Sequence, residues 1–367
     1  MKKESILFVI DSLHCAGAEK SLTTLLSLLN YSKYDVDLQL FGYGGALEEL
    51  VPKEVNILKP MEYIKFSSLS TKNAVIKSLK NMNFKMLSSR LKFSLAIRKN
   101  NYSNAQKARV YWQKVSNVIE NNNKEYDIAI SYAQGVPTFY VAEKVCAKKK
   151  LAWVNVSYKL EDEDRIFQEH FYDKYNKIVA VSDSAKNIFL ETFPKYTDKL
   201  EIIYDINDAD FIKKMSDQGQ SYNDNYTGLR ILTIGRLANQ KGYDMALEAC
   251  NILKEKGIEF KWYSLGIGPL KEEIEKYINE NNLENNFKLL GVKSNPYPFI
   301  KDCDIYVQTS RFEGFGIAIA EARMLNKPVV TTRFDAVYNQ MKDRKNGLVV
   351  DMNSQGIVNG ILELINN

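Results

Sequence analysis

The sequence predicts an α/β protein built from two doubly wound parallel sheets in tandem. Short, continuous apolar runs, typical of buried parallel strands, alternate along the chain with segments of helical spacing. This alternation stops in a polar stretch at 216–228 and then starts again. The length of 367 residues also suits two domains of about 100–200 residues each.

The first domain is expected to span residues 1–205. A strand at Ile6–Ile10 precedes a loop and a helix at Glu19–Leu29, whose leucines recur on one face. Strand, loop and helix in this order open a parallel α/β unit. The run Ser182-Asp183-Ser184 resembles an N-cap for a helix at 185–192. Further strands are predicted at 36–41, 126–131, 151–156, 177–181 and 200–203.

A linker is expected at 206–228, because its last part is polar and has no apolar periodicity. The second domain then spans 229–367. Ligands of doubly wound sheets bind beyond the carboxyl ends of the strands, so we expect a cleft between two facing domains. The predicted strands are 229–234, 260–265, 287–290, 305–308 and 328–332, and the predicted helices are 243–256, 270–281, 317–325 and 356–365.

The composition argues against several classes of protein. A net charge of +5 is too mild for an overall nucleic-acid binder, and two histidines argue against a His-based metal cluster. No stretch approaches the ~20 apolar residues of a spanning helix, and the first apolar run is too short for a signal peptide. We therefore expect a cytoplasmic protein with ordinary, reduced, buried thiols at Cys15, Cys146, Cys250 and Cys303.

Segment 65–114 differs from the rest of the chain. It is rich in lysine and arginine, contains neither Asp nor Glu, and carries apolar residues at helical spacing. A basic amphipathic stretch of this kind can lie on an anionic membrane surface, which would make the protein a peripheral membrane protein. The alternative is a set of helices that pack through their apolar faces and leave their lysines in water.

The strongest functional signal is the run from Ser310 to Gly316, which lies between a predicted strand and a predicted helix. A Gly-rich turn at a helix N-terminus favours an anion such as a diphosphate. Glu313 and Glu321 flank this turn, and carboxylates accept hydrogen bonds from sugar or ribose hydroxyl groups. The alternative is that Glu313 is a surface residue and Glu321 only stabilises the helix dipole.

Glycines and cations follow other strands. Gly235, Arg236 and Lys241 come directly after the strand at 229–234, where an arginine fork and a lysine charge could clamp phosphate oxygens. The turn at 266–268 is a weaker signal. In the first loop, Gly17 permits close approach to a ligand, although a plain turn also explains it.

Taken together, these residues resemble glycosyltransferase family four, the large retaining family with the two-domain GT-B fold. The matches run in family order along nearly the whole chain, and the block from Ser310 to Glu321 is the most specific. They comprise Ala16–Lys20, Val179–Ser182 followed by 199–204, Gly235-Arg236, Lys241-Gly242, Gly266-x-Gly268-Pro269, Gly291, Asp304, and Ser310–Gly316 with Glu321-Ala322.

The resemblance implies a role for each matched residue. Arg236 and Lys241 would neutralise the donor diphosphate, and Glu313 would contact hydroxyl groups of the donor sugar. These three are the catalytic candidates. The donor-binding candidates are Gly17 from the first domain, Gly235, Gly268, Val292 beside the base, Gly314, Phe315, Gly316, Ile317, and Glu321 at the ribose.

The implied reaction transfers a sugar, with retention, from a nucleotide diphosphate sugar to a glycan or lipid-linked acceptor in cell-surface polysaccharide synthesis. UDP is the expected nucleotide, and no metal or cofactor is expected. His14, Ser131 and Gln134 are acceptor-side candidates. Asp-x-Asp occurs four times, which makes it too unspecific to indicate a metal, and we expect Asp304 to be structural.

Some positions depart from the family pattern. Ala16 replaces a glycine, Asn155 stands where many relatives carry His, and 204–207 lacks the usual Asn-Pro turn. The final helix that often returns to the first domain is expected to be shortened or replaced.

Other functions on the same fold stay open. A non-catalytic GT-B partner could bind a glycan or a sister transferase, although it need not keep Arg236, Lys241, Glu313 and Glu321. An epimerase or a glycosyl phosphorylase is another alternative. A dehydrogenase fits least, because no Gly-x-Gly-x-x-Gly follows the first strand.

Overall fold

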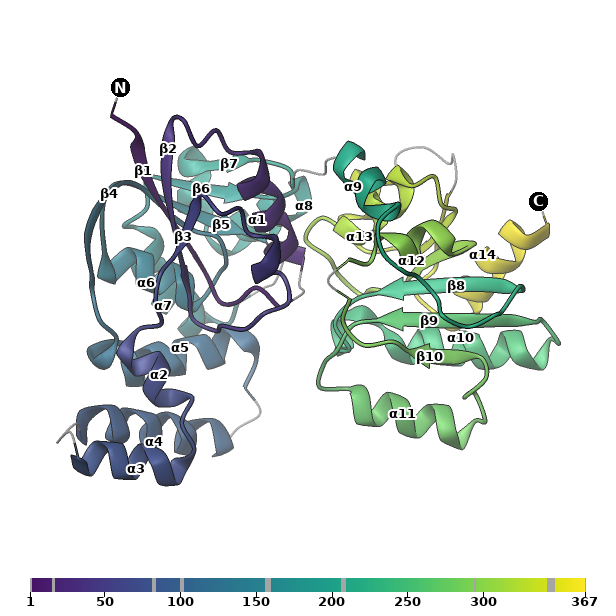
Figure 1. Cartoon of the computed structure of the whole chain (residues 1–367), viewed down its shortest axis with the longest axis horizontal. Coiled ribbons are helices and arrows are strands. Elements are labelled where there is room, and N and C mark those ends of the chain that lie inside the picture. The colour runs from purple at the N-terminus through teal and green to yellow at the C-terminus, as the bar shows by residue number, and fades with distance from the viewer. Residues whose placement is uncertain are drawn as a thin grey trace. The chain divides into compact units, whose positions relative to one another are not determined.

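The structure is a computed structural model, and it divides the chain into two compact units. One unit comprises residues 1–14 and 25–203, and the other comprises residues 15–24 and 204–367. The residues that the structure describes are 2–14, 17–80, 84–99, 102–155, 160–205, 209–293, 295–341 and 347–366. Each unit is described by itself below (Figure 1).

The first unit is built on a seven-stranded parallel sheet in the order β3-β2-β1-β4-β5-β6-β7. The strand order reverses between β1 and β4, which confirms the predicted doubly wound sheet. Its strands are β1 (Glu4–Ile10), β2 (Tyr34–Leu40), β3 (Val55–Ile57), β4 (Asn122–Ser131), β5 (Val145–Val154), β6 (Lys177–Ala180) and β7 (Leu200–Ile202).

Helices cover this sheet and extend from it. Segment 65–114 forms most of a group of helices, α2 to α5, and the predicted cap of α8 is present, since Ser182 Oγ accepts from the N–H of Ala185 at 3.0 Å. The helices are α1 (Gly17–Leu28), α2 (Glu62–Ser67), α3 (Thr71–Lys80), α4 (Phe84–Lys99), α5 (Asn104–Val115), α6 (Val136–Lys144), α7 (Asp162–Tyr172) and α8 (Asp183–Thr192). Residues 17–24 of α1 are grouped with the second unit.

The second unit repeats the topology with six parallel strands in the order β10-β9-β8-β11-β12-β13. Its strands are β8 (Leu229–Ile234), β9 (Phe260–Leu265), β10 (Phe287–Leu289), β11 (Ile305–Gln308), β12 (Val329–Thr332) and β13 (Gly347–Val350). Its helices are α9 (Ala209–Ser216), α10 (Tyr243–Glu255), α11 (Lys271–Glu280), α12 (Tyr297–Asp302), α13 (Ile317–Met324) and α14 (Ser354–Asn366). Short 3₁₀ helices in the two units are η1 (Glu48–Leu50), η2 (Ser116–Val118), η3 (Pro194–Lys199), η4 (Asn239–Lys241) and η5 (Val337–Asn339).

Successive residues of a strand pack in hydrophobic cores on opposite faces of the second sheet. Ile231 packs in one core with α10, α11 and α14, whereas Leu232 packs in the other with α9, α12 and α13. Figure 1 shows α12 and α13 on one side of the strands and α10 and α11 on the other. Because both faces are covered, the strands are mostly apolar, which is why the sequence revealed them.

Part of the segment expected to be a linker is instead packed structure. Within 206–228, α9 buries Ile212 in the second unit, and the ring of Tyr222 lies 4.3 Å from that of Tyr263. The segment is polar overall, so the sequence did not indicate that a few of its apolar residues pack in the core. A second expectation also differs, because Cys146 is exposed, whereas Cys250 and Cys303 are buried as expected.

Candidate active site

Two loops meet at the carboxyl end of the second sheet, where its strand order reverses. One follows β8 and carries Gly235, Arg236 and Lys241, and the other follows β11 and runs from Ser310 to Gly316. Because β8 and β11 are paired neighbours, the two loops lie side by side. This is the place where doubly wound sheets bind their ligands.

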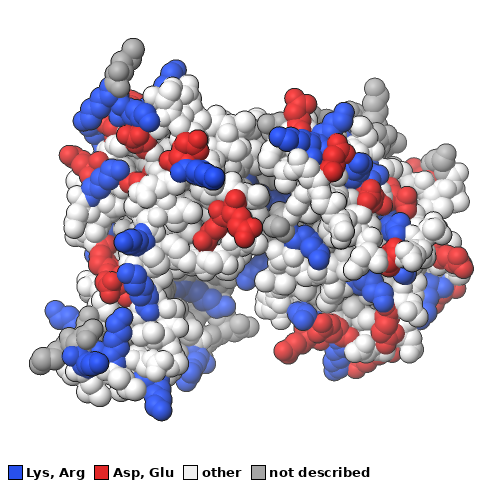
Figure 2. Space-filling view, viewed as in Figure 1, with Lys and Arg blue, Asp and Glu red and all other residues white. Residues whose placement is uncertain are grey.

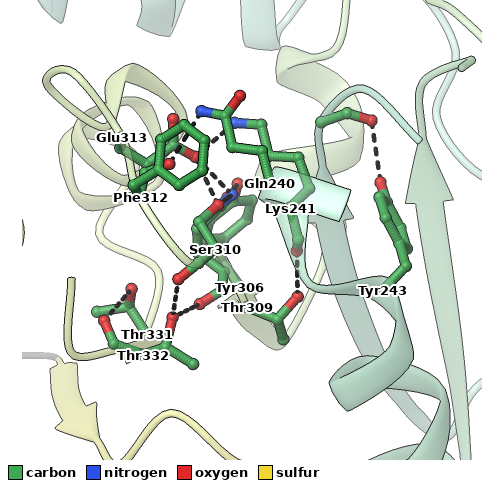
Figure 3. A network of polar contacts seen from close by, with 12 residues as sticks. Gln240, Lys241, Tyr243, Tyr306, Thr309, Ser310, Phe312, Glu313, Thr331 and Thr332 are labelled. Atoms are coloured by element: carbon green, nitrogen blue, oxygen red, sulfur yellow. Dashed lines mark hydrogen bonds and ion pairs between the residues drawn. The ribbon is translucent and has the colours of Figure 1, made fainter. Parts of the chain in front are cut away.

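Glycine 242 allows the two loops to touch. It has a φ of +64°, and a Cβ built there would lie 2.0 Å from the carbonyl oxygen of Thr309. Thr309 Oγ1 in turn donates to the carbonyl oxygen of Lys241 at 2.7 Å, and Gln240 Nε2 donates to that of Phe312 at 2.9 Å. The backbones are therefore fixed against each other, and Lys241 is held at a defined place (Figure 3).

Glu313 is the centre of a polar network. Its Oε1 accepts from the ammonium of Lys241, from Ser310 Oγ at 2.6 Å and from Gln308 Nε2 at 3.1 Å. The side chains of Lys241 and Glu313 are 18% and 11% exposed, so this ion pair is largely shielded from water. No residue that the structure describes donates to Oε2, which leaves that oxygen as an acceptor for a ligand hydroxyl.

Buried residues hold this network from below. The hydroxyl of Tyr306 donates to Gln308 Oε1, and Gln308 Nε2 donates to Ser310 Oγ at 2.7 Å as well as to Glu313. Complete burial raises the pKa of Tyr306 well above its ordinary value, so the hydroxyl stays a donor. Gln308 is thus oriented with its amide N–H₂ toward Glu313.

Arg236 and the start of α13 provide positive potential in the same unit. Arg236 is exposed, and it has no ion pair with any residue in the described ranges. Gly316 caps α13 in the left-handed conformation, with a φ of +83°. The first N–H groups of a helix have no partner within it, so the backbone at Ile317 and the residue after it can bind an anion. Gly17 lies near this helix start, since a Cβ added there would be 3.5 Å from Ile317 Cδ1.

Glu321 is almost completely buried on α13 and is already paired. Its Oε1 accepts from the hydroxyl of Tyr297 at 3.0 Å, and the ammonium of Lys20 lies 3.0 Å from Oε2. Lys20 belongs to the short segment 15–24 that is grouped with the second unit. The carboxylate of Glu321 is therefore held in a fixed orientation.

The two further glycine turns pack against the loop after β8. A Cβ at Gly266 would lie 2.0 Å from the carbonyl oxygen of Gly235, and one at Gly268 would lie 2.3 Å from that of Leu237. Gly268 thus has a close-packing role in the backbone. Gly291 O accepts from the N–H of Gly266 at 2.9 Å, which places half-buried Val292 in the next loop along the sheet edge.

The acceptor-side candidates have different environments. Ser131 at the end of β4 is fully buried, so it offers no exposed surface in this structure. His14 is exposed after β1, and Gln134 is half-buried before α6.

The donor-side candidates Phe315 and Gly314 lie in the loop before α13, and the ring of Phe315 is 6.2 Å from that of Tyr204.

Three structural findings bear on other expectations. In the described part of the chain, no group of three or more His, Cys, Asp and Glu residues could hold a metal ion. No helix there is long and apolar enough to cross a membrane. Asp304 has the expected structural role, since its Oδ2 accepts from the N–H of Arg230 at 2.7 Å and bridges β8 to β11.

Sequence reasoning missed the residues beneath Glu313. Gln308 gave a usable signal, because it is a polar residue at the end of an otherwise apolar buried strand. Tyr306 gave none, since a tyrosine in a strand is commonly a packing residue. Tyr297 and its hydrogen bond to Glu321 also had no signal, because the two residues are 24 positions apart and on different helices.

Two doubly wound parallel sheets in one chain are the architecture of the GT-B glycosyltransferases. A crystal structure of a Staphylococcus aureus TarM mutant in complex with fondaparinux, alpha-GlcNAc-glycerol and UDP superimposes with a TM-score of 0.66 at 15% identity, covering 99% of this chain and 93% of that one. This similarity shows that the fold is GT-B.

Residues 216–367 match the family model described as glycosyl transferases group 1. The chain is 33% identical over 138 residues to a poly(ribitol-phosphate) alpha-N-acetylglucosaminyltransferase of S. aureus, covering 36% of this chain and 28% of that protein. It is 29% identical over 185 residues to an N-acetylgalactosamine-N,N'-diacetylbacillosaminyl-diphospho-undecaprenol 4-alpha-N-acetylgalactosaminyltransferase of Campylobacter jejuni. This match covers 50% of this chain and 49% of that protein. The matches span less than half the length of these relatives.

Proposed function

We propose that this protein transfers a sugar from a nucleotide diphosphate sugar, with UDP as the nucleotide, to a glycan or lipid-linked acceptor in cell-surface polysaccharide synthesis. The observation that carries the proposal is the convergence of Lys241 and Glu313 at the point where the second sheet reverses its strand order. The family of residues 216–367 and the names of the relatives support the same reaction.

Different residues of the site would bind different groups of the donor. Exposed Arg236 and shielded Lys241 would neutralise the diphosphate, together with the N–H groups at the start of α13. Glu313 would accept from hydroxyl groups of the donor sugar, and Glu321 from those of the ribose. Val292 would lie beside the base.

The chemistry then needs charge stabilisation more than a protein nucleophile. The bond between the sugar C1 and the phosphate oxygen breaks, and the acceptor oxygen forms a new bond to C1 on the same face. The acceptor proton passes to the departing phosphate oxygen, so atoms and charge balance. Fixed cations that meet the charge on the leaving phosphate lower the barrier, because they need not reorganise during the reaction. The proposal includes no metal and no cofactor.

The proposed location is the cytoplasm, at the inner face of the membrane. A lipid-linked acceptor would be presented there, and the scattered cysteines fit a reducing compartment. Part of the basic segment 65–114 would contact the membrane.

The test is nucleotide release from UDP-, GDP- and ADP-sugars in the presence of a metal chelator. Slow hydrolysis of one donor that is lost in Lys241→Ala and in Glu313→Ala, but kept in the surface variant Lys276→Ala, would support the proposal. Lys276 is a suitable control because it forms only an exposed i,i+4 pair with Glu280. An absence of both turnover and nucleotide binding would favour the alternative, a non-catalytic GT-B partner of a glycan or a sister transferase.

A further inference from the structure

Helices α3 and α4 expose large apolar side chains that the fold does not use. Val75, Ile76 and Leu79 of α3, and Phe84, Leu91 and Leu95 of α4, are between 39% and 63% exposed. Single exposed apolar residues are ordinary on protein surfaces, but six on two adjoining helices are a patch that needs an explanation.

In α4 the exposed apolar residues form one stripe. Phe84, Leu91 and Leu95 are seven and then four residues apart, which places them on the same side of the helix. The other side of α4 already contacts the rest of the unit. The ring of Phe93 meets that of Tyr111 edge-on at 5.1 Å, and Arg90 donates to the carbonyl oxygen of Leu69 at 2.7 Å. The stripe is therefore not needed for packing in this unit.

Helix α3 repeats this division. Ala74 and Ser78 are buried and four residues apart, so they form the inward side. Val75 and Leu79, also four residues apart, face away from it, and Ile76 lies beside them. Each helix thus presents an apolar stripe outward.

Lysines flank both stripes and are not neutralised. Lys72 and Lys80 lie beside the stripe of α3, and Lys85 and Lys92 beside that of α4. None of the four forms an ion pair within the ranges that the structure describes, and neither helix contains an acidic residue. Figure 2 shows the described parts of α3 and α4, at the lower left, in blue and white.

Helix α5 has the opposite character, although it belongs to the same basic segment. Its Arg109 is buried and pairs with Asp164 at 2.6 Å and with Glu163, and its Trp112 is in the core. The two interpretations of segment 65–114 therefore apply to different parts of it. The packed-helix interpretation describes α5, and the exposed stripes belong to α3 and α4.

We propose that the outward faces of α3 and α4 form a docking surface for an anionic lipid membrane. Apolar side chains between unpaired lysines match the boundary between anionic headgroups and acyl chains, where lysine stems reach outward while apolar groups leave water. The inference deepens the proposed function, on which it rests, because a membrane-bound enzyme meets a lipid-linked acceptor on a surface.

The experiment is cosedimentation of the full chain with two kinds of vesicle, one of phosphatidylcholine alone and one with an equal amount of phosphatidylglycerol. A charge variant carries Lys72→Gln, Lys80→Gln and Lys85→Gln, and an apolar variant carries Leu79→Ser, Leu91→Ser and Leu95→Ser. A matched control removes three exposed charges from the second unit, through Lys213→Gln, Lys256→Gln and Lys276→Gln. Oligomeric state and donor hydrolysis without vesicles are measured for every variant.

The wild type and the control should bind the anionic vesicles, and salt should weaken binding. The charge variant should lose about a hundredfold in partitioning, at roughly fivefold per lysine, and the apolar variant should also detach. Donor hydrolysis should be unchanged, which separates this proposal from the proposed function. Equal binding to both vesicles, no binding at all, or variants that bind like the wild type would overturn it. So would a wild-type oligomer that the apolar variant dissociates, since the faces would then cover a second copy.

Discussion

The ammonium of Lys241 lies against Oε1 of Glu313, although the two residues are 72 positions apart in the sequence. Both are proposed to contact the donor, but at different groups, the diphosphate and the sugar. Without donor, each therefore neutralises the other. Binding of a diphosphate would require Lys241 to exchange a carboxylate for phosphate oxygens, which makes the ion pair a competitor of the ligand.

Replacing Glu313 by Gln should consequently separate nucleotide affinity from turnover. Free Lys241 should bind UDP about fivefold more tightly, as expected for an ion pair worth about 1 kcal/mol. Turnover of the sugar donor should fall about a hundredfold, because a charged acceptor for its hydroxyl is lost. Titration calorimetry with UDP and steady-state hydrolysis measure the two effects.

The control for that variant is Glu275→Gln, which removes a carboxylate from an exposed pair with Lys271 at 3.5 Å. It should change neither quantity. If Glu313→Gln bound UDP no better than the wild type, or worse, Lys241 would not be the residue that exchanges partners.

Tyr306 should act on the reaction through Gln308 without touching the donor. Tyr306→Phe removes the hydroxyl that orients Gln308, so the carboxylate of Glu313 loses its fixed position. We expect kcat to fall about tenfold with little change in UDP affinity, since misplacement of a contacting group acts mainly on the reacting geometry. A stability loss of about 1–2 kcal/mol should accompany it.

Tyr175→Phe is a matched control for this loss of stability. Tyr175 is also fully buried, and its hydroxyl donates to the carbonyl oxygen of Thr138 at 2.6 Å, in the first unit. The control should be destabilised to a similar degree and keep its kcat. Equal losses of kcat in both variants would mean that the effect of Tyr306 is one of stability alone.

The sequence predicted the strands better than the helices, for a physical reason. A strand covered on both faces is largely an apolar run, as in Ile6–Ile10 of β1, and such runs are conspicuous. Helix α6 was missed because nearly all of its residues are buried, so it lacks the alternation of apolar and polar sides that marks a helix. Strands β3 and β13 were also missed, because they lie at sheet edges and are only three and four residues long.

The site was predictable where its chemistry is local. Glycines, a helix start and charged residues within the run from Ser310 to Gly316 marked a candidate ligand loop. The pairing of Lys241 with Glu313 was not predictable, because it depends on how two loops meet in space. The contact of Gly242 with Thr309, which brings these loops together, likewise leaves no mark in the sequence beyond the glycine itself.

Gly242 should therefore be intolerant of alanine. The substitution combines a left-handed backbone, at about 1–3 kcal/mol, with a clash against the carbonyl oxygen of Thr309. We expect a total loss above about 3 kcal/mol in calorimetric unfolding, together with loss of donor hydrolysis. Gly257→Ala isolates the backbone part, because Gly257 has a φ of +73° with nothing within 4 Å of the added Cβ. A Gly242→Ala protein no less stable than Gly257→Ala would refute the close contact.

Asp205 and Asp224 should respond to pH with opposite signs. Burial raises the pKa of Asp205 to about 6, an effect that its hydrogen bond from the Ser21 hydroxyl only partly offsets. Burial also acts to raise the pKa of Asp224, but hydrogen bonds from Lys261, Tyr263 and Arg230 outweigh it and hold that pKa below its ordinary value.

An acid whose pKa rises on folding stabilises the protein fully below its unfolded value of 3.8, and this contribution is lost as pH rises to about 6. Asp205→Asn should therefore raise the unfolding free energy at pH 7 by up to about 3 kcal/mol, with no gain near pH 3. Asp224→Asn should lower stability at pH 7, and this loss should shrink as pH falls from 3.8 toward the depressed pKa of the folded state, because the contribution is complete only above 3.8. Thermal melts of both variants from pH 3 to 8 decide the matter, since two curves that shift in the same direction would contradict the assigned environments.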